Sequence, residues 1–209
     1  MSHREPFLTL CALLTLSLSA CKSTGADGDG PQSEWLEPSP ILSQQLEDEA
    51  ARLPWTHGFE RLEQIRWFSL VGEPAYDTLF KLAEDPRDDV ASAALAALGD
   101  TQDRRLVPHI HRLGWNEERM AGDLGLERAR TLLRLGDWSE IPTLIRGLKD
   151  ERQYTRTLCI QALQGATGET FGFDPKADLT DRVRAVDSWE VWWRARTGEG
   201  LLGSASRPG

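Results

Sequence analysis

The sequence predicts an all-α protein, a short α-solenoid of stacked helix pairs that ends in a tryptophan-rich capping helix. Apolar residues recur at the spacing of helices, and no run of β-branched residues alternates at the spacing of strands. Two apolar segments end in the same tripeptide, Leu-Gly-Asp, at Leu98–Asp100 and Leu135–Asp137. Glycines recur near the ends of such segments at intervals of 27, 37 and 29 residues, a range typical of helical repeats, at Gly72, Gly99, Gly136 and Gly165.

Residues 1–20 have the layout of a secretory signal peptide. A short charged start precedes about twelve mostly apolar residues, Phe7–Leu18, fewer than the roughly 20 that span a membrane. The run closes with Leu18-Ser19-Ala20-Cys21, a box that resembles the lipobox of bacterial lipoproteins. The resemblance implies that residues 1–20 are removed and that fatty acyl chains, such as palmitate, on Cys21 anchor the protein in a membrane. The alternative is an ordinary signal peptide with a chance cysteine.

Composition divides the remaining chain into three parts. Residues 21–40 are rich in Gly, Ser, Asp and Pro, which is typical of a flexible tether. Residues 41–197 are expected to form the helical repeat domain, and residues 198–209 a disordered tail. The net charge of −9 argues against nucleic acid as a partner, because phosphate backbones require clustered Lys and Arg. The same negative charge argues against adhesion of the folded part to anionic lipid headgroups, so the acyl chains would provide the contact with the membrane.

The repeats are expected to follow a common plan. A glycine in the left-handed conformation ends the first helix, and a proline starts the second helix, as at Pro108 and Pro142. Asp85–Leu98, with its closely spaced alanines and leucines, resembles the first helix of a HEAT repeat, and the resemblance to HEAT-like proteins covers residues 58–168. It implies stacked helix pairs, although a non-repetitive helical bundle is the alternative.

The C-terminal block differs from the repeats. A helix is expected from about Thr180 to Arg196, with Val183, Val186, Trp189 and Trp193 on its buried side and Phe171 and Phe173 beneath it. A solenoid must cover the apolar flank of its last repeat, so this helix is interpreted as the cap.

No catalytic, metal or cofactor site is expected. His109 and His111 are two residues apart on a predicted helix, so their side chains point in different directions and cannot share one metal ion. Cys159 lies in an apolar helical stretch and is interpreted as a buried, inert thiol. No nucleophile or phosphate-binding motif occurs in the sequence.

These observations predict a non-enzymatic lipoprotein in the bacterial cell envelope, at the cell membrane or outer membrane, facing the periplasm or the exterior. Its partner would be an unidentified envelope protein that binds a concave face formed by the second helices. The residues expected on that face are Tyr76, Lys81, His109, Arg112, Trp115, Arg146, Lys149 and Trp192. Eight tryptophans leave open a glycan- or peptidoglycan-binding module, and an enzyme such as a HEAT-like lyase is a further alternative.

Overall fold

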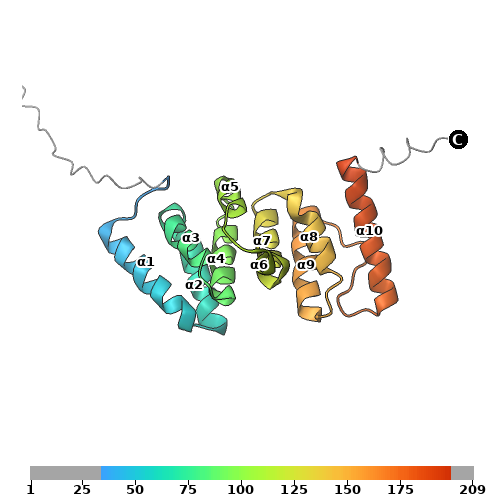
Figure 1. Cartoon of the computed structure of the whole chain (residues 1–209), viewed down its shortest axis with the longest axis horizontal. Coiled ribbons are helices and arrows are strands. Elements are labelled where there is room, and N and C mark those ends of the chain that lie inside the picture. Colours follow the sequence, from blue (N-terminus) through green and yellow to red (C-terminus); the bar gives the residue numbers. More distant parts are fainter. Residues whose placement is uncertain (1–33, 199–209) are drawn as a thin grey trace, which may run out of the picture. The chain divides into compact units, whose positions relative to one another are not determined.

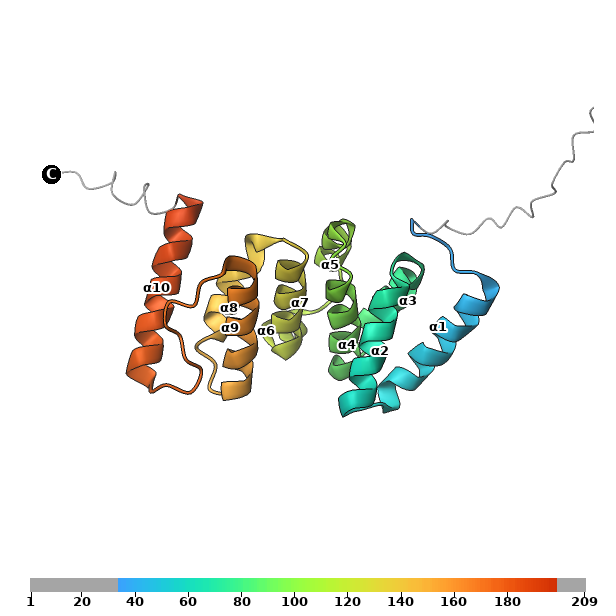
Figure 2. The same cartoon turned by 180° about the vertical axis from the view of Figure 1, so that it is seen from behind.

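The computed structural model describes residues 34–198, and this part of the chain is all-helical, without a strand. The expected signal peptide, Cys21 and most of both flanking segments lie outside the described residues. Figures 1 and 2 show the helices from opposite sides. The α-helices are α1 (Pro40–Arg52), α2 (Gly58–Val71), α3 (Tyr76–Ala83), α4 (Asp88–Asp100), α5 (Val107–His111), α6 (Glu117–Ala121), α7 (Asp123–Arg134), α8 (Ile141–Gly147), α9 (Gln153–Thr167) and α10 (Leu179–Thr197).

Short 3-10 turns precede the second helix of each pair. They are η2 (Glu73–Ala75) before α3, η3 (Arg104–Leu106) before α5 and η4 (Trp138–Glu140) before α8, and a further one, η1 (Leu53–Trp55), precedes α2. The Asp103 and Asp137 carboxylates accept backbone N–H groups two residues further on, at 3.0 and 2.9 Å. Such caps satisfy N–H groups that have no partner within the helix. The predicted prolines lie in the first turn of α5 and α8.

The glycine interpretation was correct at Gly72 and Gly136, which have positive φ angles of 69° and 85°. It was wrong at Gly99 and Gly165, because both lie inside their helices, and α9 ends at Thr167 with Gly168 as its cap. Gly99 serves a close approach of helices instead: a Cβ built there would lie 3.3 Å from Cγ2 of Thr131 in α7. A helical glycine at a crossing point and a glycine at a helix end are indistinguishable in sequence.

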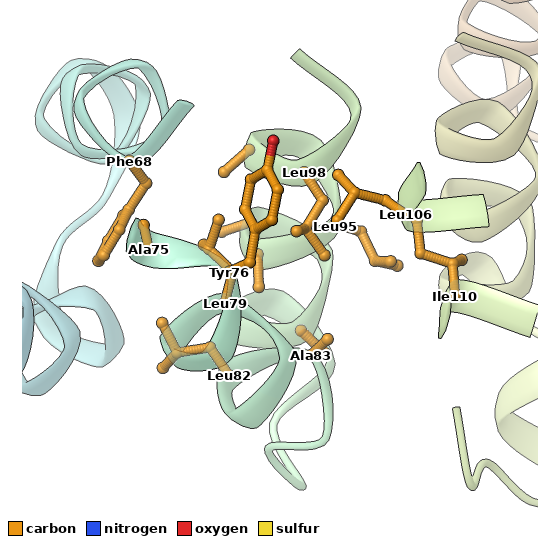
Figure 3. Packing of buried hydrophobic residues seen from close by; sticks show 14 of the residues in the cluster. Phe68, Ala75, Tyr76, Leu79, Leu82, Ala83, Leu95, Leu98, Leu106 and Ile110 are labelled. Atoms are coloured by element: carbon orange, nitrogen blue, oxygen red, sulfur yellow. The ribbon is translucent and has the colours of Figure 1, made fainter. Parts of the chain in front are cut away.

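The first helices of the pairs pack against one another in chain order. Helix α4 contacts α2 and α7, and α7 in turn contacts α9. The second helices pack beside them, α3 on α4, and α8 on α7 and α9. Figure 3 shows Tyr76 and Leu79 of α3 beside Leu95 and Leu98 of α4 in the larger of two buried clusters. Fully burying one such leucine stabilises the fold by about 1.5–3 kcal/mol.

Helix α10 packs against α8 and contributes Trp189 to the second buried cluster, together with Phe173. Trp189 is fully buried, and the Phe171 ring meets it edge-on at 4.8 Å between centroids. Val183, expected on the buried side, is 49% exposed. The buried side of α10 is centred on Ala185 and Trp189, so Val183 lies at its margin. None of the helices within residues 34–198 is long and apolar enough to cross a membrane.

Candidate binding surface on the second helices

The segment that enters the domain is seated on α3 and α5. Trp35 is only 7% exposed, and its ring meets the rings of Tyr76 at 5.1 Å and His109 at 4.9 Å, measured between centroids. Phe80 of α3 lies 5.6 Å from the His109 ring and completes the aromatic floor. We call this group, together with Arg105 of η3, the Trp35 site. The flexible tether expected over residues 21–40 therefore does not include Trp35.

Polar contacts fix the geometry around this aromatic floor. The Arg105 guanidinium lies 5.5 Å from the centre of the Trp35 ring and pairs with Glu73 at 2.8 Å and Asp103 at 2.7 Å. The Tyr76 hydroxyl donates a hydrogen bond to Asp103 at 3.1 Å. The entering segment adds its own contact, because the Leu36 N–H donates to the Glu73 carboxylate at 3.2 Å.

These contacts favour the ionised forms of the Glu73 and Asp103 carboxyl groups. Hydrogen bonds from Arg105 are the main reason that the pKa values of Glu73 and Asp103 are lowered from their ordinary values. Burial raises the pKa of Tyr76, so its hydroxyl stays protonated as a donor. The Trp35 site is thus a packed aromatic cluster, with the Arg105 guanidinium beside the Trp35 ring and the carboxylates of Glu73 and Asp103 paired with that guanidinium.

Two of the predicted binding residues, Tyr76 and His109, lie in this site, and Arg112 contacts it at His109. Tyr76 is 3% exposed, so the expectation that it meets a partner directly was wrong; Trp35 covers it. His109 is partly exposed and lies 3.3 Å from the Glu34 carboxylate, an ion pair when the histidine is protonated. Lys81 is exposed on α3, and Arg112 is exposed beside His109, with its Nη2 3.3 Å from Nδ1.

The remaining candidates lie on other elements. Trp115 is half-buried, because its indole N–H donates to the carbonyl of Ala83 at 3.1 Å, and Arg119 stacks over its ring. Arg146 is exposed at the end of α8, and Lys149, just beyond α8, pairs with Glu190 of α10 at 2.7 Å.

Trp192 belongs to an aromatic group at α10. Its ring lies 5.5 Å from Trp189 and 6.3 Å from Trp138, and the Arg196 guanidinium lies 4.4 Å from the centre of the Trp138 ring. The predicted binding residues therefore fall into separate groups rather than one continuous site.

Sequence reasoning missed a polar network around His111. Its Nε2 lies 2.6 Å from the Asp137 carboxylate, and its Nδ1 lies 2.9 Å from an Arg128 guanidinium nitrogen. Because a guanidinium can only donate, Nδ1 accepts from Arg128 and Nε2 donates to Asp137. Arg128 is buried and also pairs with Glu140 at 2.8 Å. The network joins α5 to α7 and η4, and a structural role accounts for all its contacts.

Opposing effects act on Asp137. Burial works to raise its pKa, but the hydrogen bonds from His111 and Ser139 outweigh it, so the pKa is lowered. His109 and His111 contact different acids, Glu34 and Asp137, as their two-residue separation predicts. Within residues 34–198, no group of three or more His, Cys, Asp or Glu side chains could hold a metal ion.

Cys159 is a buried thiol in α9, and burial is the main reason that its pKa rises to about 12. A thiol in that environment stays protonated and unreactive at neutral pH. Comparisons with known proteins add no family: neither a protein-family model nor a curated protein nor a solved structure matches the chain.

Proposed function

We propose that this chain is a lipid-anchored, non-enzymatic scaffold of the bacterial cell envelope that binds an extended segment of a partner protein on its second helices. The observation that carries the proposal is the seating of Trp35. A non-helical stretch of this chain already lies on α3 and α5 with a buried aromatic ring and a backbone hydrogen bond. A surface that holds one such segment has the chemistry to hold another beside it or in its place.

The packing order supports a HEAT-like solenoid as the frame for this surface. Each first helix from α2 to α9 contacts the next one, and second helices fill the spaces beside them. Helix α10 fits the role of a cap, since it buries Trp189 and Val186 against the last pair. Stacked pairs of this kind present their second helices as one extended, rigid surface.

The chemistry of the surface indicates which partner segment would fit. Arg112 is exposed and contacts His109, and Arg105 lies over the indole ring. Lys81 is a further exposed cation on α3, the helix that carries Tyr76 and Phe80. A segment with an aromatic anchor flanked by carboxylates would match these cations, as Glu34 already does in its contact with His109.

The lipobox supports anchoring close to a membrane. Thirteen peptide units separate Cys21 from Glu34, so the domain would lie within about 45 Å of the anchor, from about 3.4 Å per residue. Confinement at this distance raises the local concentration of the domain around membrane partners. Two acyl chains meet the usual requirement for stable anchoring.

Two measurements test the two halves of the proposal. Metabolic labelling with a fatty acid should mark the wild-type chain and not Cys21→Ala, and the variant should leave the membrane fraction. Absence of label on the wild-type chain would refute anchoring.

Crosslinking in intact cells tests partner binding. Lys81→Glu with Arg112→Glu should abolish a specific crosslinked species that the wild-type chain forms, whereas Lys176→Glu, on the loop before α10, should retain it. If the species survives the double variant, the partner does not use the second helices. Quenching of tryptophan fluorescence by peptidoglycan fragments without any protein crosslink would support the glycan-binding alternative instead.

A further inference from the structure

Helix α2 carries an apolar stripe that nothing in the described structure covers. Phe59, Leu62 and Leu70 are 74%, 63% and 75% exposed, and they recur along one side of the helix. The opposite side is buried through Gln64 and Phe68. Helices of single domains seldom expose three large apolar residues in a row, so the stripe indicates an interaction surface.

The position of α2 indicates that a helix would fit there. Among the first helices, α4 packs between α2 and α7, and α7 packs between α4 and α9. Helix α2 packs against α4 alone among them. Helix α1 reaches α2 through Glu49 and Arg52, which bind Gln64 and Glu60 away from the stripe. A further helix laid on the stripe would continue the packing of first helices by one more step.

The charges beside the stripe are complementary to those of a second α2 helix, so they favour a second copy of the same chain as the occupant. Glu63 and Arg66 are exposed on this side of α2, and neither has an ion-pair partner among residues 34–198. When two α2 helices pack antiparallel, residues whose numbers sum to 129 lie opposite each other. Glu63 then faces Arg66 of the second copy, and Arg66 faces its Glu63. The same register places Phe59 opposite Leu70 of the second copy.

We propose that two copies of the chain associate through α2 in this antiparallel register, forming a symmetric homodimer. The arrangement is isologous, which is the commonest symmetry of soluble homo-oligomers. Leu62 would pack on the aliphatic stem of Arg66 of the second copy, since arginine stems readily cover apolar surface. The alternating charges favour a protein copy over a lipid surface, because the carboxylate of Glu63 gains nothing from an anionic bilayer.

Charge reversal tests the register directly. Sedimentation velocity of the full chain in density-matched detergent should show a concentration-dependent dimer. Glu63→Arg alone and Arg66→Glu alone each place like charges opposite one another and should weaken dimerisation at least about tenfold. The double variant Glu63→Arg/Arg66→Glu exchanges the two charges and should restore the dimer to near wild-type strength. Val191→Glu, an apolar-to-charged change on α10, is the matched control and should dimerise normally.

Each other outcome counts against the dimer. A wild-type chain that stays monomeric overturns it, as do single reversals without effect, or a double variant that stays monomeric while its circular dichroism matches the wild type. Membrane contact would replace the proposal if the Cys21→Ala chain, which lacks the acyl acceptor, bound neutral phosphatidylcholine vesicles as a monomer and lost that binding on Leu62→Glu. Neither result depends on whether Cys21 is acylated or on partner binding at the Trp35 site.

Discussion

Gly147 lies at a close contact between α8 and α9, and replacing it with alanine should destabilise the protein. A Cβ built at this position would fall far inside the van der Waals distance of the Cys159 sulfur and 3.1 Å from a methyl group of Leu126. Carbon atoms pack best at about 3.5–4.0 Å, so both neighbours would have to move. Cys159 is buried and Leu126 packs against the same cluster, which leaves them little space.

Two effects of opposite sign set the change in the free energy of unfolding that Gly147→Ala causes. Overpacking a core by one methyl group costs about 1–3 kcal/mol. Alanine in place of glycine within a helix gains up to about 1 kcal/mol, and less here, because Gly147 is the last residue of α8. We therefore expect Gly147→Ala to lower the free energy of unfolding by about 1–2 kcal/mol.

A double-mutant cycle with Cys159→Ala isolates the clash. The cysteine variant alone loses a buried sulfur atom and should cost about 1 kcal/mol. In the double variant the new methyl group occupies the space that the sulfur left, so the loss should be smaller than the sum of the two single losses by about 1 kcal/mol or more. Urea unfolding followed by circular dichroism measures all four free energies. Additivity within about 0.5 kcal/mol would refute the close contact between α8 and α9.

Three further predictions concern other parts of the structure. Trp35→Ala should lower the free energy of unfolding by about 2–3 kcal/mol. Trp55→Ala is the control, because that side chain is 80% exposed, and it should change the free energy by less than about 0.5 kcal/mol. Equal losses in urea titrations would argue against the burial of Trp35. Hydrogen bonds from Arg87 lower the pKa of Asp85 to about 2, below its unfolded value of about 4, so the stabilisation present above pH 4 is lost as the pH falls towards 2. Unfolding measured across this range should show a shallower loss for Asp85→Asn than for the wild type, and parallel curves would contradict the pairing. The Cys159 thiol, with a pKa raised to about 12, should react with a disulfide reagent at pH 8 only after unfolding, and fast labelling of the folded chain would contradict its burial.

The sequence by itself determined the helical class of the described part of the chain. Apolar periodicity and the prolines at the starts of α5 and α8 are local signals, and each depends only on residues within one or two turns. The burial of Cys159 was predictable for the same reason, since its neighbours along the helix are apolar.

Only the tertiary structure decided which glycine ends a helix, where Trp35 packs and which apolar face stays uncovered. Gly99 and Gly136 stand in the same tripeptide, yet Gly99 lies inside α4 where Thr131 of α7 approaches it, whereas Gly136 takes a positive φ directly after α7. The place of the Trp35 ring on Tyr76 and His109 depends on residues about 40 and 74 positions away, and no local pattern encodes such a contact. The uncovered stripe of α2 is likewise visible only once the partners of every other helix are known, because an amphipathic pattern records that a face is apolar and not what covers it.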